Sequence, residues 1–114
     1  MKTLHLVLKA EWYDMVASGE KREEYREITP YWLNRLRDKA RTCIDKVVCR
    51  AKCDLQCWKT DKCGFSDFDV VCFYRGYTKQ RMIFECKSIH IGRGRKKWGA
   101  PDHDVFIIRL GERI

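Results

Sequence analysis

The chain has 114 residues, which suits a single domain with one hydrophobic core. Apolar residues make up 45% and charged residues 35%, which excludes a disordered chain, and no stretch reaches the roughly 18 apolar residues that cross a bilayer. The formal net charge of +8 favours polyanionic partners, of which nucleic acid is the commonest. We therefore expect a globular cytoplasmic protein without membrane contact.

The N-terminal segment predicts a strand followed by a short helix. Leu4, Leu6 and Leu8 lie at alternate positions, the pattern of a strand with one buried face. In residues 10–18, apolar residues recur at helical spacing and acidic residues lie in the early turns. Gly19 predicts the end of this helix, since a left-handed turn there favours glycine.

The next segment, residues 19–26, packs opposite charges at close spacing. If the chain is extended after Lys21, Glu24 and Arg26 lie side by side on one face, while Tyr25 points to the other. Lys21 then lies where the helix turns into the strand. Such a cluster suits a small polar ligand. The alternative is an edge strand whose solvated charges prevent pairing with other strands.

The spacing Gly19-x-Lys21-x-x-Glu24-x-Arg26 resembles the signature of the ASCH family, small proteins similar in fold to PUA RNA-binding domains. The resemblance covers most of the chain but leaves residues from about 41 to 66 unmatched. It implies an α+β fold: a PUA-like small mixed or antiparallel β-barrel flanked by short helices. It also implies one domain, residues 1–114, with a Cys-rich insertion at about 41–66.

Proteins of this family include RNA-binding modules, ribonucleases and amidohydrolases of acetylated cytidine, so the resemblance implies a function of one of these kinds. In the amidohydrolases a threonine stands where this chain has Glu24. A carboxylate is not the hydroxyl nucleophile of acyl transfer, so the amidohydrolase reaction would require Glu24 to act through water.

A second helix is predicted to begin at Thr29 and Pro30, because threonine caps free amides and proline suits the first turn. Basic residues cover the helix face opposite its apolar stripe. They form either a solvated face, which we favour, or the border of a nucleic-acid groove. The apolar stripe consists of Trp32, Leu33, Leu36 and Ala40.

Residues 41–66 hold most of the seven cysteines. If this segment is helical, three of the thiols align on one face. A zinc site is one interpretation, although the paired C-x2-C spacing of zinc ribbons is absent. Disulfide pairing and unligated thiols are the others, and we favour unligated thiols and no cofactor. The candidate zinc ligands are Cys49, Cys53, Cys57 and Cys63, with Cys43 as a substitute for Cys63.

Two strands, residues 68–74 and 80–91, are predicted to form a hairpin. Its tip carries Tyr74, Arg75 and Tyr77, residue types that stack on bases and hold phosphates, although a turn that merely carries tyrosines fits equally well.

The most basic loop, residues 92–99, contains Arg93, Arg95 and Trp98 and resembles a segment that follows a phosphate backbone. It lacks the spacing of a P-loop. We expect His103, which follows it, to be an exposed loop histidine rather than a base. Val105–Ile108 predicts the last strand.

We therefore predict RNA or nucleotide binding in a cleft lined by Lys21, Glu24 and Arg26. The alternative is a hydrolase of RNA or of a modified nucleoside, in which Lys21, Glu24 and Tyr25 are catalytic. A third hypothesis is an interaction module stabilised by zinc. The predicted rim of the cleft consists of Tyr74, Arg75, Tyr77, Arg93, Arg95 and Trp98.

Overall fold

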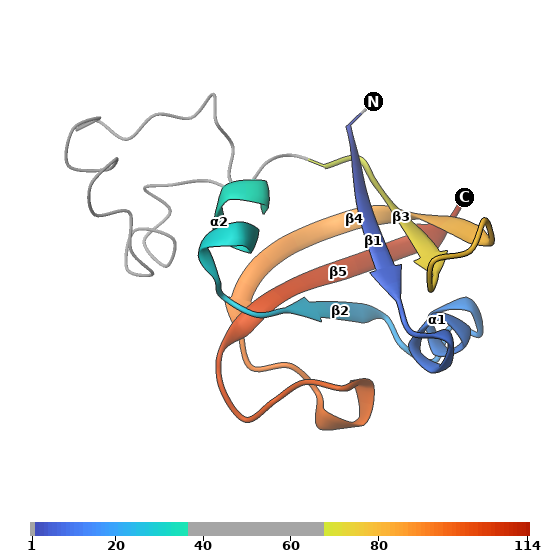
Figure 1. Ribbon diagram of the computed structural model, residues 1–114. Coiled ribbons are helices and arrows are strands. Elements are labelled where there is room, and N and C mark those ends of the chain that lie inside the picture. The colour runs from blue at the N-terminus through green and yellow to red at the C-terminus, as the bar shows by residue number, and fades with distance from the viewer. Residues whose placement is uncertain (1, 37–67) are drawn as a thin grey trace. The chain divides into compact units, whose positions relative to one another are not determined.

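The computed structural model describes residues 2–36 and 68–114, and its elements are labelled in Figure 1. The chain divides into two compact units, one formed by Met1–Glu27 with Phe68–Ile114 and the other by Ile28–Asp67. The first unit contains the sheet and helix α1 (Ala10–Ala17), and the second contains helix α2 (Pro30–Leu36). None of the helices in the described ranges is long and apolar enough to span a membrane.

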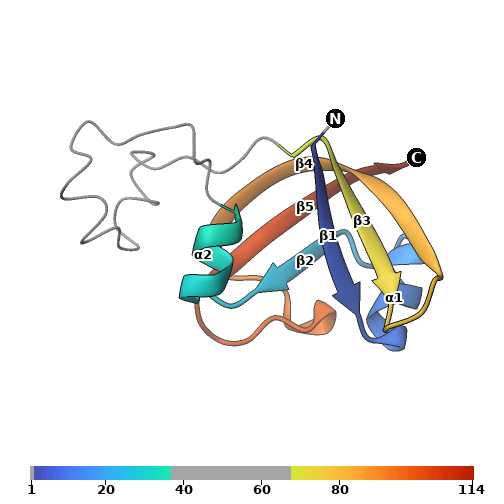
Figure 2. The same cartoon turned by 45° about the horizontal axis from the view of Figure 1, so that its top comes forward.

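The first unit is built on a five-stranded mixed sheet that curls into a half-barrel, with β4 and β5 as its long curved strands (Figures 1 and 2). The spatial order is β1-β3-β4-β5-β2, and only the β1–β3 pair is parallel. This confirms the predicted α+β class. The strands are β1 (Thr3–Leu8), β2 (Glu23–Arg26), β3 (Val70–Arg75), β4 (Arg81–Gly92) and β5 (Val105–Arg113).

The sheet does not close into a full barrel through backbone pairing. β1 pairs with β3 and β2 pairs with β5, so both are edge strands of the described sheet. Each edge strand therefore turns one row of backbone groups away from the sheet. The core lies on the inner face of the sheet, where the fully buried side chains include Leu4, Leu6, Phe73, Phe106 and Ile108.

Most of the predicted elements of this unit are confirmed. The leucines of β1 are buried while Val7 is exposed, and Gly19 adopts a left-handed conformation with φ of 85° just after α1. β3 and β4 form the predicted antiparallel hairpin. β5 continues past the predicted end at Ile108, because pairing with β4 holds its polar second half in a strand.

Helix α2 begins as predicted. The Oγ1 atom of Thr29 accepts a hydrogen bond from the backbone N–H of Trp32 at 3.3 Å, and Pro30 is the first helical residue. Arg35 lies over the Trp32 ring and donates to the Tyr31 hydroxyl at 3.0 Å. The rest of the predicted stripe and the whole Cys-rich insertion lie outside the described residues.

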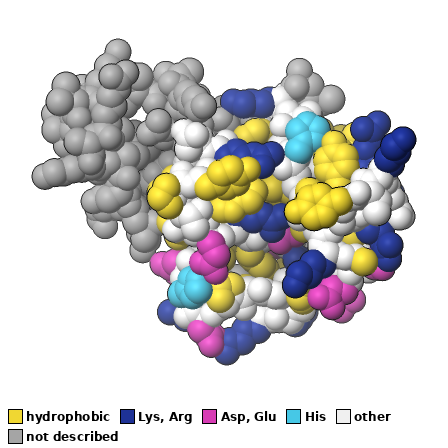
Figure 3. Space-filling view, in the orientation of Figure 1, with side chains coloured by type: hydrophobic (Ala, Val, Ile, Leu, Met, Phe, Trp, Pro, Cys, Tyr) yellow, Lys and Arg dark blue, Asp and Glu magenta, His cyan; other side chains and the backbone are white. Residues whose placement is uncertain are grey.

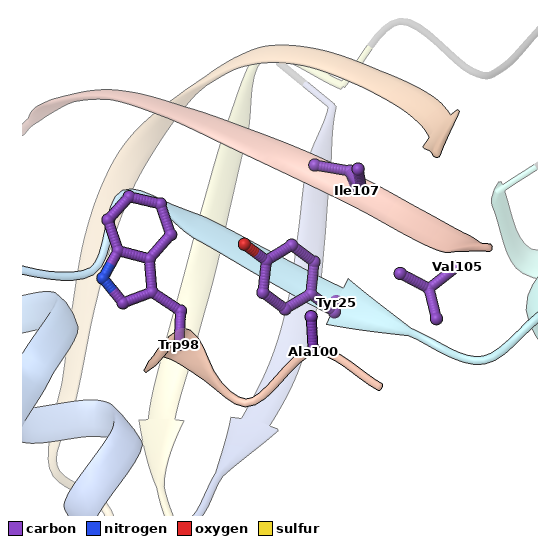
Figure 4. Close-up of a cluster of buried hydrophobic side chains, with 5 residues drawn as sticks. All are labelled: Tyr25, Trp98, Ala100, Val105 and Ile107. Carbon is purple, nitrogen blue, oxygen red and sulfur yellow. The ribbon is translucent and has the colours of Figure 1, made fainter. Parts of the chain in front are cut away.

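The long loop between β4 and β5 packs against the outward-facing side of β2. Its short 3-10 helix, Lys96–Trp98, contributes Trp98 to a buried cluster whose other members come from β2, β5 and the loop itself (Figure 4). Position 94 of this loop requires a glycine. At Gly94 the reason is close approach, since a Cβ atom would collide with the Tyr25 ring and with Ala100 Cβ. The cluster consists of Tyr25, Trp98, Ala100, Val105 and Ile107.

We predict that Gly94→Ala lowers the free energy of unfolding by about 1–3 kcal/mol, because the added methyl group overpacks the contact between the loop and Tyr25. Gly92→Ala is the control, since its Cβ would lie 3.5 Å from Ile107 Cδ1, an ordinary contact. The control should be neutral or stabilising by up to about 1 kcal/mol. Urea denaturation measures both variants, and equal effects would contradict the packing argument.

Candidate functional site

The turn after α1 places Lys21 inside the protein. Gly19 reverses the chain, and the backbone N–H of Lys21 then donates to the Met15 carbonyl at 3.1 Å. The lysine side chain is left only 3% exposed. Its ammonium group lies 3.3 Å from Glu24 Oε1, 4.8 Å from the centre of the Trp12 ring and 5.7 Å from that of Tyr25. The two distances to the ring centres are within the range of cation–π attraction.

Glu24 lies on β2 and is 4% exposed. Its Oε1 atom accepts hydrogen bonds from Lys21 Nζ at 3.3 Å and from the Tyr25 backbone N–H at 2.9 Å, and it lies 3.2 Å from Arg26 Nη1. Its Oε2 atom is buried and finds no hydrogen-bond donor among the described residues. One carboxylate oxygen thus accepts two hydrogen bonds and forms an ion pair, whereas the other finds no donor in the described part of the chain.

Arg26 joins Glu24 to two strands. Besides its ion pair with Glu24, it donates from Nη1 to the Tyr25 carbonyl at 2.9 Å and from Nη2 to the Val7 carbonyl at 3.2 Å. Val7 belongs to β1 and Arg26 to β2, so the guanidinium connects the two edges of the half-barrel. These contacts confirm that Glu24 and Arg26 lie side by side, and they hold the arginine in a positioning role.

Burial lowers the pKa of the Lys21 ammonium below its ordinary value of 10.5. The negative charge and hydrogen bond of Glu24 oppose this shift, while the positive charge of Arg26 adds to it. A lysine in this environment gives up its proton more readily than an exposed one. The group therefore suits either anion binding or proton transfer.

Tyr25 points to the opposite side of β2 from Glu24, as predicted. Its hydroxyl donates to Glu23 Oε1 at 2.9 Å and accepts from the backbone N–H of Arg95 at 3.0 Å. Burial raises its pKa to about 12, the Arg95 N–H partly offsets the shift, and Glu23 adds to it. Tyr25 is therefore a neutral phenol at physiological pH, and its contacts fasten the β4–β5 loop to β2.

Of the three residues predicted at the hairpin tip, Tyr74 and Arg75 contact other parts of the protein and Tyr77 is exposed. Tyr74 stacks with His5, and its hydroxyl lies 3.0 Å from His5 Nδ1. Arg75 forms an ion pair with Asp14 of α1 at 3.3 Å. Tyr77 is 99% exposed, so its ring is accessible for stacking.

The charge of the β4–β5 loop is partly balanced by acidic residues that follow in the same loop or lie on the segment after β2. Sequence reasoning identified residues 92–99 as the most basic loop of the chain. Such exposed pairs contribute little to stability, but they reduce the local positive potential. The pairs are Arg93 with Asp104 at 3.8 Å, Lys96 with Asp102 at 2.7 Å and exposed His103 with Glu27 at 2.8 Å.

Trp98 is buried in the cluster of Figure 4, only 7% exposed, rather than displayed on the loop surface. The guanidinium of Arg95 and the ammonium of Lys97 lie 5.0 and 5.2 Å from the centre of its ring. The indole Nε1 atom is buried and reaches no acceptor within the described part of the chain. The tryptophan thus organises two cations near the loop surface.

The surface facing the viewer in Figure 3 mixes basic, acidic and apolar side chains. The magenta groups lie in the lower half of this view, whereas dark blue groups lie in both halves.

Metal binding by the described residues receives no structural support. Within 2–36 and 68–114, no group of three or more His, Cys, Asp or Glu side chains could hold a metal ion. Cys72 and Cys86 are free thiols, and burial together with Asp69 raises the pKa of Cys86 to about 11. The candidate zinc ligands Cys49, Cys53, Cys57 and Cys63 lie outside the described residues.

Comparisons with protein-family models, with curated proteins and with solved structures found no match to this chain. The site must therefore be interpreted from its own chemistry. Sequence reasoning missed the contact between the Trp12 ring and the Lys21 ammonium. The position of Trp12, nine residues before Lys21, carried no sign of that contact.

We predict that Arg26→Lys lowers the free energy of unfolding by about 2 kcal/mol, because one ammonium cannot serve both carbonyls and the carboxylate. Arg75→Lys is the matched control, and its exposed pair with Asp14 should change stability by no more than about 0.5 kcal/mol. Urea denaturation measures both. Equal losses would show that Arg26 does not hold the strand edges together.

We also predict one tyrosine with a pKa of about 12, well above the ordinary value near 10. The absorbance of tyrosinate, followed while the pH is raised, should show this late step in the native protein and lose it in Tyr25→Phe. Because the folded protein keeps the Tyr25 proton that the unfolded chain releases near pH 10, stability should fall between about pH 10 and 12. Tyr77→Phe should retain the late step.

Proposed function

We propose that this protein binds nucleotides or single-stranded RNA at the cluster formed by Lys21, Glu24 and Arg26. The observation that carries the proposal is the meeting of two cationic side chains and one backbone N–H on a single buried carboxylate oxygen, with two aromatic rings beside the lysine. A buried ion network is rarely needed for stability, since apolar side chains of similar volume often serve as well. Perturbed buried charges of this kind are concentrated at functional sites.

The chemistry of the cluster matches the parts of a nucleotide. Lys21 supplies donors for a phosphate or a base carbonyl, and Glu24 supplies an acceptor for an N–H group. Outside the cluster, Arg95 and Lys97 provide cations beside Trp98, and Tyr77 provides an exposed ring. Cations near aromatic rings are typical of surfaces that follow single-stranded nucleic acid.

The resemblance of Gly19, Lys21, Glu24 and Arg26 to the ASCH signature supports the same proposal. We extend it to the fold: the curled sheet is proposed to be a PUA-like half-barrel, the architecture that the resemblance implies. The positive φ of Gly19 and the joint contacts of the three charged residues give each signature position a physical role in this chain.

Hydrolysis of RNA or of a modified nucleoside is the second candidate, and the lowered pKa of Lys21 favours it. An amine that exchanges its proton easily can serve as a general acid or base. The glutamate at position 24 requires that any hydrolysis proceed through an activated water. Incubation with single-stranded RNA and with acetylated cytidine, with Lys21→Met in parallel, tests for turnover. The zinc-stabilised module stays a prediction, which metal analysis of the purified protein checks.

We predict that Lys21→Met weakens binding of a fluorescently labelled single-stranded RNA by roughly tenfold or more, because a charge-assisted hydrogen bond is lost. Lys79→Met removes the same charge from an exposed position in the hairpin turn and is the matched control. Fluorescence anisotropy at several salt concentrations measures both, and wild-type affinity should fall steeply with salt.

Equal weakening by the two substitutions would mean that only net charge matters, and it would overturn the proposed site. Absence of binding by the wild type would overturn the proposed function itself. Circular dichroism and thermal unfolding of each variant confirm that a loss of binding is not a loss of fold.

A further inference from the structure

Glu24 presents one saturated and one unsatisfied oxygen. Oε1 accepts hydrogen bonds from Lys21 Nζ and the Tyr25 N–H and forms an ion pair with Arg26 Nη1, whereas Oε2 is shielded from solvent without a donor in the described part of the chain. An acceptor buried without a partner destabilises the free protein, and a ligand that supplies the missing donor recovers that loss. An ionised carboxylate only accepts hydrogen bonds, so the matching ligand group must be a donor.

The direction of this unsatisfied oxygen is set by the groups around it. The backbone N–H of Tyr25 cannot move without β2, and Arg26 is tied to two backbone carbonyls. Neither donor can turn to Oε2 without giving up its present contacts. The carboxylate is therefore preorganised, which is what a specificity-determining group requires.

Of the three neighbours of Oε1, Lys21 has the fewest polar contacts in the described part of the chain. Its long side chain is joined to Glu24 by one hydrogen bond of 3.3 Å, and the ammonium otherwise rests on aromatic rings. Because Oε2 is shielded, a ligand reaches it only after a neighbouring group has moved. A lysine that shifts from Glu24 toward a ligand phosphate or carbonyl would leave the carboxylate able to accept from the base.

We infer that Glu24 selects a nucleobase with an exocyclic amino group, as in cytosine or adenine, over one with a carbonyl at that position. The inference rests on the proposed function and names the ligand class of the same site. An amino group projects from the ring and can enter a confined space as a donor. In uracil and hypoxanthine a carbonyl takes its place and would be forced against the carboxylate, a mismatch that a polar site rejects strongly.

The test compares two pairs of 5′-monophosphates, cytidine with uridine and adenosine with inosine, by NMR titration. Within each pair the exocyclic amino group is exchanged for a carbonyl, and the adjacent ring nitrogen changes from an acceptor to an N–H donor. We expect the wild type to prefer the amino member by roughly tenfold or more, the effect of one hydrogen bond to a charged group. Glu24→Gln should reduce the preference to within roughly threefold, since an amide can donate as well as accept. Glu20→Gln, at an exposed position, should keep it.

Equal affinities within both pairs, or a preference that survives in Glu24→Gln, would overturn the inference while leaving RNA binding through Lys21 intact. RNA binding without measurable binding of any mononucleotide would overturn it as well. If the wild type binds neither RNA nor mononucleotides, the proposed function fails together with the inference.

Discussion

A single carboxylate oxygen, Glu24 Oε1, joins three groups of the candidate site: it accepts hydrogen bonds from Lys21 Nζ and the Tyr25 N–H and forms an ion pair with Arg26. Lys21 lies in the turn after α1, and the Tyr25 N–H belongs to β2. Arg26 also donates to the Val7 carbonyl of β1. Removing the carboxylate would leave two buried or half-buried cations without their counter-ion. Local chain direction, strand-edge contact and site electrostatics are therefore determined by the same group.

The contact between Arg26 and Val7 explains how a half-barrel can keep its edges together without a sixth strand. β2 has only four residues and could make few ladder hydrogen bonds with β1. A guanidinium presents donors in a rigid fork, so it can bind both edges at once. Among the described residues, the Arg26 side chain donates across this seam to the Val7 carbonyl.

Much of the fold was predictable because it follows from local patterns. The alternating leucines of β1, the left-handed Gly19 and the β3–β4 hairpin require only periodicity and turn chemistry, and each was confirmed. Glu24 and Arg26 were placed together by strand spacing alone. The burial of Trp98 and the contact between Arg26 and Val7 depend on pairings of residues distant in sequence. No local pattern encodes such pairings. The sequence of the basic loop therefore did not indicate that part of it packs in a buried cluster.

One face of β2 carries Glu24 of the candidate site, and the other face holds the β4–β5 loop. Tyr25 contributes to both faces, through its backbone and through its side chain. Its backbone N–H fixes Glu24, while its hydroxyl and ring hold the β4–β5 loop through the Arg95 N–H and Trp98. A shift of the loop cannot move the Tyr25 ring far without disturbing the backbone that orients the carboxylate. Arg95 and Lys97 lie over Trp98, which packs in the same cluster as the Tyr25 ring. The loop cations and the Glu24 carboxylate are therefore positioned by the same strand, β2.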